Sequence, residues 1–206
     1  MRIERAGVPF IAGFGIPAVV LLALGYLTLG IVVLAGAAFM TYFFRDPERV
    51  APAGADLVVS PADGTVMAAG VADPGTAPPG SWLQITIFLS PLDVHVNRMP
   101  IGGRVTRVDY SPGTFLPAYK PASGLNERTE IWIDHDGQTV VVRQVVGVLA
   151  RRVVCRVQQG ASVAAGERFG LMKFGSRMDV FLPPSARLRV SRGARVRGGE
   201  TVLAEL

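Results

Sequence analysis

The chain has 206 residues, of which 50% are hydrophobic, and it carries a formal charge of +5. A chain of this length suffices for one domain with its own core plus an appendage. The single cysteine, Cys155, excludes an internal disulfide framework, and its apolar surroundings predict a core residue. One cysteine with two histidines, His95 and His135, gives no zinc-ligand spacing, so we expect no metal.

Residues 1–46 predict a membrane-anchoring segment. No charged residue occurs from Ala6 to Phe44. A single transmembrane helix needs roughly 20 residues, so this stretch is long enough for two helices, joined near Gly25 to Gly30. Arginines flank both ends, which by the positive-inside tendency keeps both ends in the cytoplasm: Arg2, Arg5, Arg45 and Arg49. We therefore predict a hydrophobic helical hairpin, spanning or re-entrant, on the cytoplasmic face of the cell membrane, rather than a cleaved signal peptide.

Residues 47–206 predict a second, β-rich domain. Short runs of Val, Ile, Thr and aromatic residues are separated by Gly and Pro, which predicts a barrel or sandwich rather than βαβ units. The runs are 57–60, 64–68, 82–89, 103–110, 130–135, 138–148, 152–157 and 178–182. Asp134-His135-Asp136-Gly137 is typical of a hairpin turn, so we expect His135 to be exposed there and not catalytic.

An internal echo lies near the end of the chain. Residues 161–170 and 194–203 share the pattern Val-x-x-Gly-Glu, and they resemble the hammerhead halves of biotinyl and lipoyl domains. The echo predicts a hammerhead-like C-terminal half, and it opens a non-enzymatic alternative: a membrane-anchored carrier or adaptor domain modified at Lys173. Carrier lysines occupy a tight hairpin tip, whereas Lys173 lies in a strand-like run, which argues against this alternative.

Basic residues gather in the later part of the chain. Either they form a solvated face or they attract anionic lipid headgroups, at about 1 kcal/mol for each residue close to the surface. We predict no nucleic-acid partner, because no aromatic-basic motif accompanies them. They are Arg143, Arg151, Arg152, Arg156, Arg168, Lys173, Arg177, Arg187, Arg189, Arg192, Arg195 and Arg197.

Five ordered blocks carry a family resemblance: Phe43–Arg49, Ser60–Gly64, Ser90–Pro100, Leu125–Arg128 and Phe174–Ser176. From about residue 41 to the C-terminus the chain resembles the phosphatidylserine decarboxylase proenzymes, in their short bacterial and archaeal branch. The resemblance implies self-cleavage into a large chain, 1–175, and a small chain, 176–206. These would form a heterodimer, and a further homo-oligomer stays open.

The Gly175-Ser176 step would supply the cofactor. Glycine permits unusual backbone angles and leaves its carbonyl accessible. The resemblance implies that Ser176 Oγ attacks this carbonyl, that the resulting ester is eliminated, and that a covalent pyruvoyl group, a form of pyruvate, remains at position 176. The amine of phosphatidylserine would form a Schiff base with that group, lose carbon dioxide and leave as phosphatidylethanolamine.

The resemblance also assigns the supporting residues. His95 would act as the base and proton donor, with Asp63 orienting it as in a serine triad. In the longer bacterial branch a second histidine occupies the position of Arg98, so either His95 serves both cleavage and decarboxylation or cleavage uses another base; we favour the dual role. Asn97, Arg98 and Asn126 are candidates for headgroup binding. An uncleaved membrane serine hydrolase is a second alternative, disfavoured because no Gly-x-Ser-x-Gly elbow surrounds Ser176.

Overall fold

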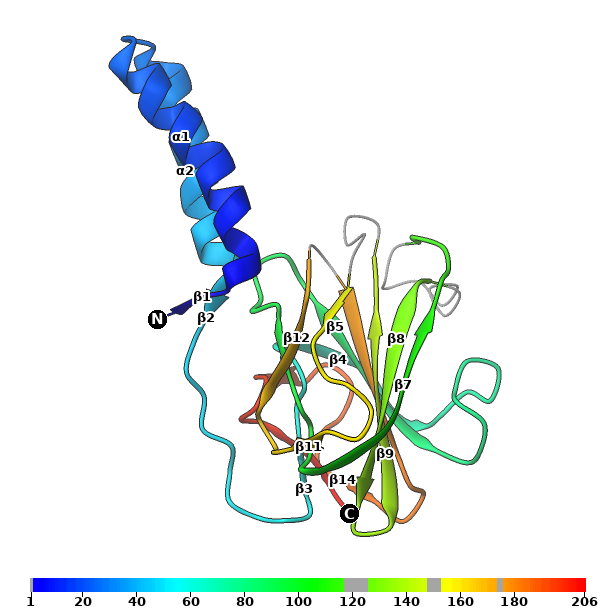
Figure 1. The fold of residues 1–206 in the computed structure, drawn as a ribbon. Coiled ribbons are helices and arrows are strands. Elements are labelled where there is room, and N and C mark those ends of the chain that lie inside the picture. The colour runs from blue at the N-terminus through cyan, green and yellow to red at the C-terminus, as the bar shows by residue number, and fades with distance from the viewer. Residues whose placement is uncertain (1, 117–125, 148–152, 174–175) are drawn as a thin grey trace. The chain divides into compact units, whose positions relative to one another are not determined.

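The computed structural model describes residues 2–116, 126–147, 153–173 and 176–206. It consists of two compact units, Met1–Glu48 and Arg49–Leu206. The first contains a pair of helices and the second is built almost entirely of strands (Figure 1).

The first unit is a helical hairpin, as predicted. After a 3₁₀ turn, η1 (Arg5–Gly7), helix α1 (Val8–Ala23) is followed by α2 (Leu27–Phe43), and β1 (Arg2–Ile3) pairs with β2 (Arg45–Asp46). Gly25, with φ of +84°, makes the turn between the helices.

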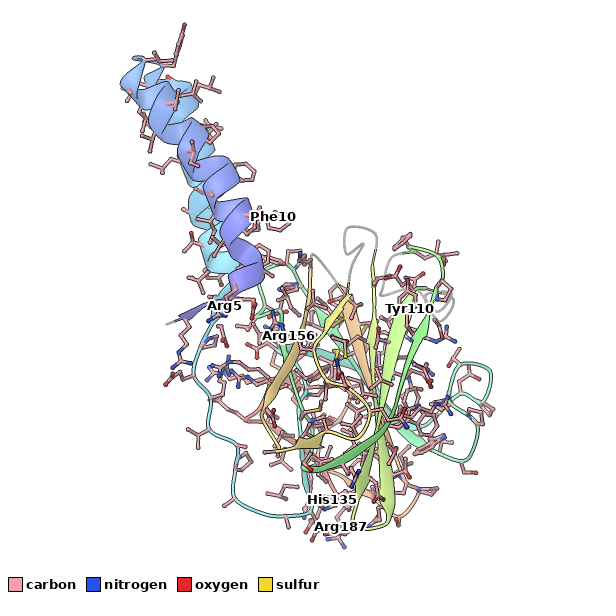
Figure 2. All side chains as sticks on the ribbon, in the orientation of Figure 1. Arg5, Phe10, Tyr110, His135, Arg156 and Arg187 are labelled. Atoms are coloured by element: carbon pink, nitrogen blue, oxygen red, sulfur yellow. The ribbon has the colours of Figure 1, made fainter. Side chains whose placement is uncertain are left out.

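Small residues let the two helices approach closely. A Cβ on Gly30 would lie 2.6 Å from Leu22 Cδ2, and one on Gly36 would lie 2.6 Å from Phe14 Cδ1. The outward side chains are almost entirely carbon (Figure 2), and those of Ile16 and Val19 are about two-thirds exposed. By length and composition, one helix, Arg5–Ala23, is able to cross a membrane, with a mean hydropathy of 2.1.

The second unit is mainly β, which confirms the predicted class. An antiparallel eight-stranded sheet has the order β11-β7-β8-β9-β13-β5-β4-β15, and two three-stranded sheets have the orders β10-β12-β6 and β14-β16-β3. The strands are β3 (Leu57–Val59), β4 (Gly64–Val71), β5 (Leu83–Leu89), β6 (Val96–Arg98), β7 (Gly103–Ser111), β8 (Arg128–His135), β9 (Gln138–Val145), β10 (Val153–Cys155), β11 (Ser162–Val163), β12 (Arg168–Met172), β13 (Ser176–Leu182), β14 (Arg187–Leu188), β15 (Arg195–Val196) and β16 (Val202–Glu205).

Strand β13 lies inside the large sheet, between β5 and β9, and all of its residues are buried. Side chains alternate across a strand, so Met178, Val180 and Leu182 belong to the main hydrophobic core, together with side chains such as Ile87 and Val142. Ser176 is the first residue of this strand, and its side chain is on the same face as those of Met178, Val180 and Leu182. It therefore faces the core side of the sheet, at one end of the core.

The second unit contains an approximate internal repeat, which explains the echo in the sequence. Strands β3, β4, β5, β15 and β16 form one half, and β6, β7, β8, β11 and β12 form the other. The β16-β3 and β12-β6 ladders have the same register and the same irregularity, and so do the β4-β5 and β7-β8 ladders.

Backbone hydrogen bonds join the two halves reciprocally. Val59 N donates to Pro100 O (2.7 Å) and Arg98 N donates to Pro61 O (2.9 Å). In the two Val-x-x-Gly-Glu turns, Gly166 N donates to Met99 O (2.8 Å) and Gly199 N donates to Ser60 O (2.7 Å). Both glycines have a φ of +78°, so the repeated glycine is required by the turn conformation. The predicted hammerhead-like turns are therefore a matched pair.

The hairpin turn between β8 and β9 is confirmed, but the expected exposure of His135 is wrong. Asp136 and Gly137 form the tip, with φ of 48° and 86°, as a type I′ turn requires. His135 ends β8 and is only 8% exposed. Its Nδ1 donates to the Gly102 carbonyl (2.8 Å), and its Nε2 lies 3.4 Å from Asp56 Oδ1. Figure 2 labels His135 at this end of the hairpin.

Candidate active site

Ser176 stands at the start of a central strand. It pairs with Leu89 of β5, and the next residue, Arg177, pairs with Phe88 on one side and Val145 on the other. The ladder therefore holds the backbone firmly from position 177 onward. The Ser176 side chain is fully buried, and its Oγ has no hydrogen-bond partner within the described part of the chain. The preceding residue of the predicted cleavage site, Gly175, lies outside the described residues.

The strand connections bring His95 to the same end of the core. Strand β5 ends at Leu89, which pairs with Ser176, and a short loop then leads to His95 just before β6. Met172, the last residue of β12, donates its N–H to the His95 carbonyl (3.2 Å). Only three residues separate Met172 from Ser176 in the sequence. Two short segments of the chain, residues 90–94 and 173–175, therefore connect the surroundings of His95 with those of Ser176.

The His95 ring is oriented by the backbone of its own loop. Its Nδ1 lies 2.9 Å from the carbonyl oxygen of Asp93, and the side chain is fully buried. A carbonyl oxygen only accepts hydrogen bonds, so we assign the proton of the neutral ring to Nδ1. Nε2 is then the nitrogen whose lone pair is able to take a proton.

Asp93 and Arg195 fix the loop that carries His95. Asp93 Oδ2 accepts from Ser90 N (2.8 Å), and Asp93 Oδ1 accepts from Arg195 Nη2 (2.7 Å). Arg195 also donates to Thr65 Oγ1 (3.0 Å). Sequence reasoning missed both residues. Asp93 lies within the Ser90–Pro100 block, so a signal was present, whereas Arg195 was only one of many arginines.

A buried amide pair lies beside His95. Because side chains alternate along β6, Asn97 projects to the same side as His95. Gln144 Nε2 of β9 donates to Asn97 Oδ1 (2.8 Å), and both side chains are fully buried. Gln144 was also missed. Its signal is a polar residue at a core-facing position of a strand that is otherwise rich in valine.

Asn126 holds the strand ends next to Ser176. Its Oδ1 accepts from Thr114 Oγ1 and Leu116 N, each at 2.9 Å, and its Nδ2 donates to Leu116 O (2.7 Å) and Val146 O (2.8 Å). Val146 follows the residue that pairs with Arg177. Both ends of the amide are already used, which favours a structural role over headgroup binding.

Arg98 and Asp63 contact the paired turns instead. Arg98 projects from the other face of β6 and donates from Nη1 to the Gly166 carbonyl (3.0 Å). Asp63 accepts from Arg49 Nη2 (3.0 Å) and from Gly198 N (2.7 Å). Arg49 also bridges to Glu200 (2.7 Å). Within the described residues Asp63 does not bond the His95 ring, so the triad contact that the resemblance implies is not formed here.

His135 lies at the opposite end of the sheet. Arg128, at the start of β8, pairs with Val145, which pairs with Arg177, while His135 is the last residue of β8. A strand of this length puts roughly 20 Å between the two ends. His135 is therefore remote from Ser176, which supports the prediction that it is not catalytic.

These features define a class: a β-domain with a buried serine at the start of a central strand, and with a buried histidine and a buried amide pair on neighbouring segments. The family model for phosphatidylserine decarboxylase matches residues 37–204. The chain belongs to this family.

Individual relatives agree over most of the chain. The phosphatidylserine decarboxylase proenzyme of Pelodictyon phaeoclathratiforme is 47% identical, over 87% of this chain and 82% of its own length. The proenzyme of Gluconobacter oxydans is 48% identical, over 84% and 79%. That of Beijerinckia indica is 42% identical, over 98% and 89%. The similarity to the Beijerinckia protein thus includes the helical hairpin.

Proposed function

We propose that this protein is a pyruvoyl-dependent carboxy-lyase that converts phosphatidylserine to phosphatidylethanolamine after cutting itself between Gly175 and Ser176. Family membership supports the reaction. The main support for the proposed site is that the Ser176 hydroxyl is fully buried and has no hydrogen-bond partner among the described residues. A buried hydroxyl is normally paired, so an orphaned one at the start of a strand indicates a group held for reaction.

Self-cleavage begins with the Ser176 hydroxyl, which is a poor nucleophile until a base takes its proton. We assign this base to His95 Nε2. Oγ adds to the Gly175 carbonyl carbon and the C–N bond breaks, so the amide becomes an ester. Loss of the α-proton of residue 176 then breaks the Cβ–O bond and releases chain 1–175 as a carboxylate. Addition of water to the remaining dehydroalanine and loss of ammonia leave the pyruvoyl group.

The surroundings of residue 176 fit such a group, because a small carbonyl replaces a side chain that is buried and makes no hydrogen bond. When formed, the pyruvoyl carbonyl supplies the electron sink that decarboxylation of an amino acid requires. Strands β5 and β9 hold Arg177 from both sides, so the new N-terminus of the small chain stays in place after cleavage.

The remaining roles belong to the chain's own side chains. His95, held by the Asp93 carbonyl, returns a proton to the carbon from which carbon dioxide leaves. Asn97 faces the same space and contacts the headgroup. Asp63 acts in self-cleavage; its bonds to Arg49 and Gly198 N–H connect the Ser60–Gly64 block to the small chain.

The partners follow from the substrate. A diacyl lipid stays in its bilayer, so we propose that the apolar hairpin anchors the enzyme at the cytoplasmic face of the cell membrane. Its basic residues favour an anionic surface. The working protein is a heterodimer of the large and small chains, and further homo-oligomerisation is compatible with it.

Denaturing mass spectrometry of the purified protein tests the proposal. We expect two chains divided after Gly175, with a blocked small chain whose mass is that expected for a pyruvoyl start. Ser176→Ala should stay a single chain and release no carbon dioxide from phosphatidylserine. A single intact chain in an active preparation, or cleavage at this position in Ser176→Ala, would falsify the proposal.

A further inference from the structure

We infer that Gln144 and Asn97 form a clamp that reads the amino-acid part of the substrate headgroup, with Gln144 binding the amine and Asn97 the carboxylate. The inference rests on the proposed function and extends it to a residue, Gln144, that the family blocks do not contain. It also assigns Asn97 one partner, the carboxylate rather than the phosphate.

The register of the sheet directs Gln144 toward Ser176. Gln144 pairs with Met178 across the β9-β13 ladder, and Ser176 lies two residues before Met178 on the same face. Such diagonal neighbours are about 7 to 8 Å apart, within reach of a long side chain. The Gln144 amide extends from the large sheet to β6, where it meets Asn97. The pair thus connects the sheet that carries Ser176 to the strand that directly follows His95.

Gly170 makes room for this contact. It pairs with Asn97 in the β12-β6 ladder, and a Cβ on it would lie 2.9 Å from Gln144 Nε2. A side chain at this position would push the Gln144 amide away from Asn97. The glycine therefore leaves the space in which the Gln144 amide reaches Asn97.

The hydrogen bonds of the pair leave one donor and one acceptor unused. Gln144 Oε1 and Asn97 Nδ2 are both buried without a partner in the described part of the chain. If both amides were reversed, the unused groups would again be one carbonyl oxygen and one NH₂. Buried amides are normally satisfied, so two unused groups on one hydrogen-bonded pair of amides point to a ligand that completes them.

The serine headgroup has the complementary set. Its amine nitrogen donates hydrogen bonds, which matches Gln144 Oε1, and its carboxylate accepts them, which matches Asn97 Nδ2. Both groups are attached to the same carbon, so one small ligand is able to satisfy both amides. The clamp would also keep the carboxylate away from water, because both amide side chains are fully buried.

The test compares substrate and product in mixed micelles, using processed enzyme. Phosphatidylethanolamine keeps the amine and lacks only the carboxylate, so its inhibition constant reports binding without the carboxylate contact. Asn97→Leu should raise KM for phosphatidylserine about 10-fold to 100-fold, as expected for a lost hydrogen bond to a charged group, and change KI for phosphatidylethanolamine less than about twofold. Gln144→Leu should raise both constants by about 10-fold or more.

Gln138→Leu is the matched control, because it makes the same change at the other end of β9 on the same face. It should leave both constants unchanged. The clamp is refuted if Asn97→Leu raises both constants equally, if Gln144→Leu raises neither, or if either variant stays uncleaved while Gln138→Leu cleaves normally. The last result would assign the two amides to self-cleavage. If the proposed function itself were wrong, the wild-type chain would neither cleave itself nor decarboxylate phosphatidylserine, which distinguishes the two failures.

Discussion

Replacing Gly170 with alanine should damage the fold and the site together. The added Cβ would lie 2.3 Å from the carbonyl oxygen of Val154 and 2.9 Å from Gln144 Nε2. Carbon and oxygen atoms in neighbouring strands normally stay about 3.3 to 3.6 Å apart. The β10 and β12 backbones must therefore separate by about 1 Å. This movement strains the register in which Gly170 pairs with Cys155.

Overpacking of this kind costs about 1 to 3 kcal/mol. For a domain of this size each kcal/mol lowers the midpoint of thermal unfolding by about 2 to 4 °C, so we expect a fall of roughly 2 to 12 °C. Circular dichroism of the Ser176→Ala background measures this fall without the complication of cleavage. In processed enzyme the same change should raise KM for phosphatidylserine, because the Gln144 amide is displaced from Asn97.

Gly102→Ala is the control for this prediction. Its nearest neighbour would be the Val163 carbonyl oxygen at 3.4 Å, which is ordinary contact, so its midpoint and KM should match the wild type. If Gly170→Ala unfolds at the wild-type temperature with an unchanged KM, the close packing of β12 against β10 and the Gln144 amide is not what limits this position. Equal losses in both variants would refute the reasoning as well.

Three further predictions follow from single contacts. Asn126→Leu removes four hydrogen bonds and should cost about 3 kcal/mol, seen as a lower urea midpoint; an unchanged midpoint contradicts the structural role. Arg195→Met removes the Arg195 hydrogen bond to Asp93 and should lower kcat about 10-fold or more through misplacement of His95, with KM little changed, in enzyme whose cleavage is verified by mass; full turnover contradicts it. Burial raises the pKa of the Cys155 thiol, so at pH 8 the folded chain holds less thiolate than the unfolded chain. Iodoacetamide should label it more slowly when folded, with the rate rising as the pH passes through the raised pKa, and equal rates at pH 8 contradict this.

Features that depend on local patterns were predictable. The hairpin follows from an uncharged apolar stretch broken by glycine, and the β-rich domain follows from runs of β-branched residues between Gly and Pro. The turn at Asp136 and Gly137 needs two positive φ angles, which those residue types supply. The short strand β6 escaped prediction, since a run of three residues has little periodicity of its own.

Features that depend on pairing between distant segments were not predictable. A turn pattern locates His135 near a tip but does not say that its ring contacts Gly102, more than thirty positions away along the chain. The resemblance implied that Asp63 orients His95, whereas the ring bonds the backbone of Asp93. Gln144 joins the site through the register of β9 with β13, and no local pattern carries that register.

The internal repeat gives a physical reason to regard the amide pair as functional. Asn97 and Gly170 pair in one half just as Val58 and Ala204 pair in the other, beside the same irregularity of the ladder. Val58 and Ala204 are fully buried members of the main core. The equivalent positions in the other half are therefore occupied by an apolar pair, so the fold does not require a polar residue at position 97. Burying amides with unused groups is costly, so the polar choice in the second half is best explained by a ligand there, in the half whose strand β12 leads directly to Ser176.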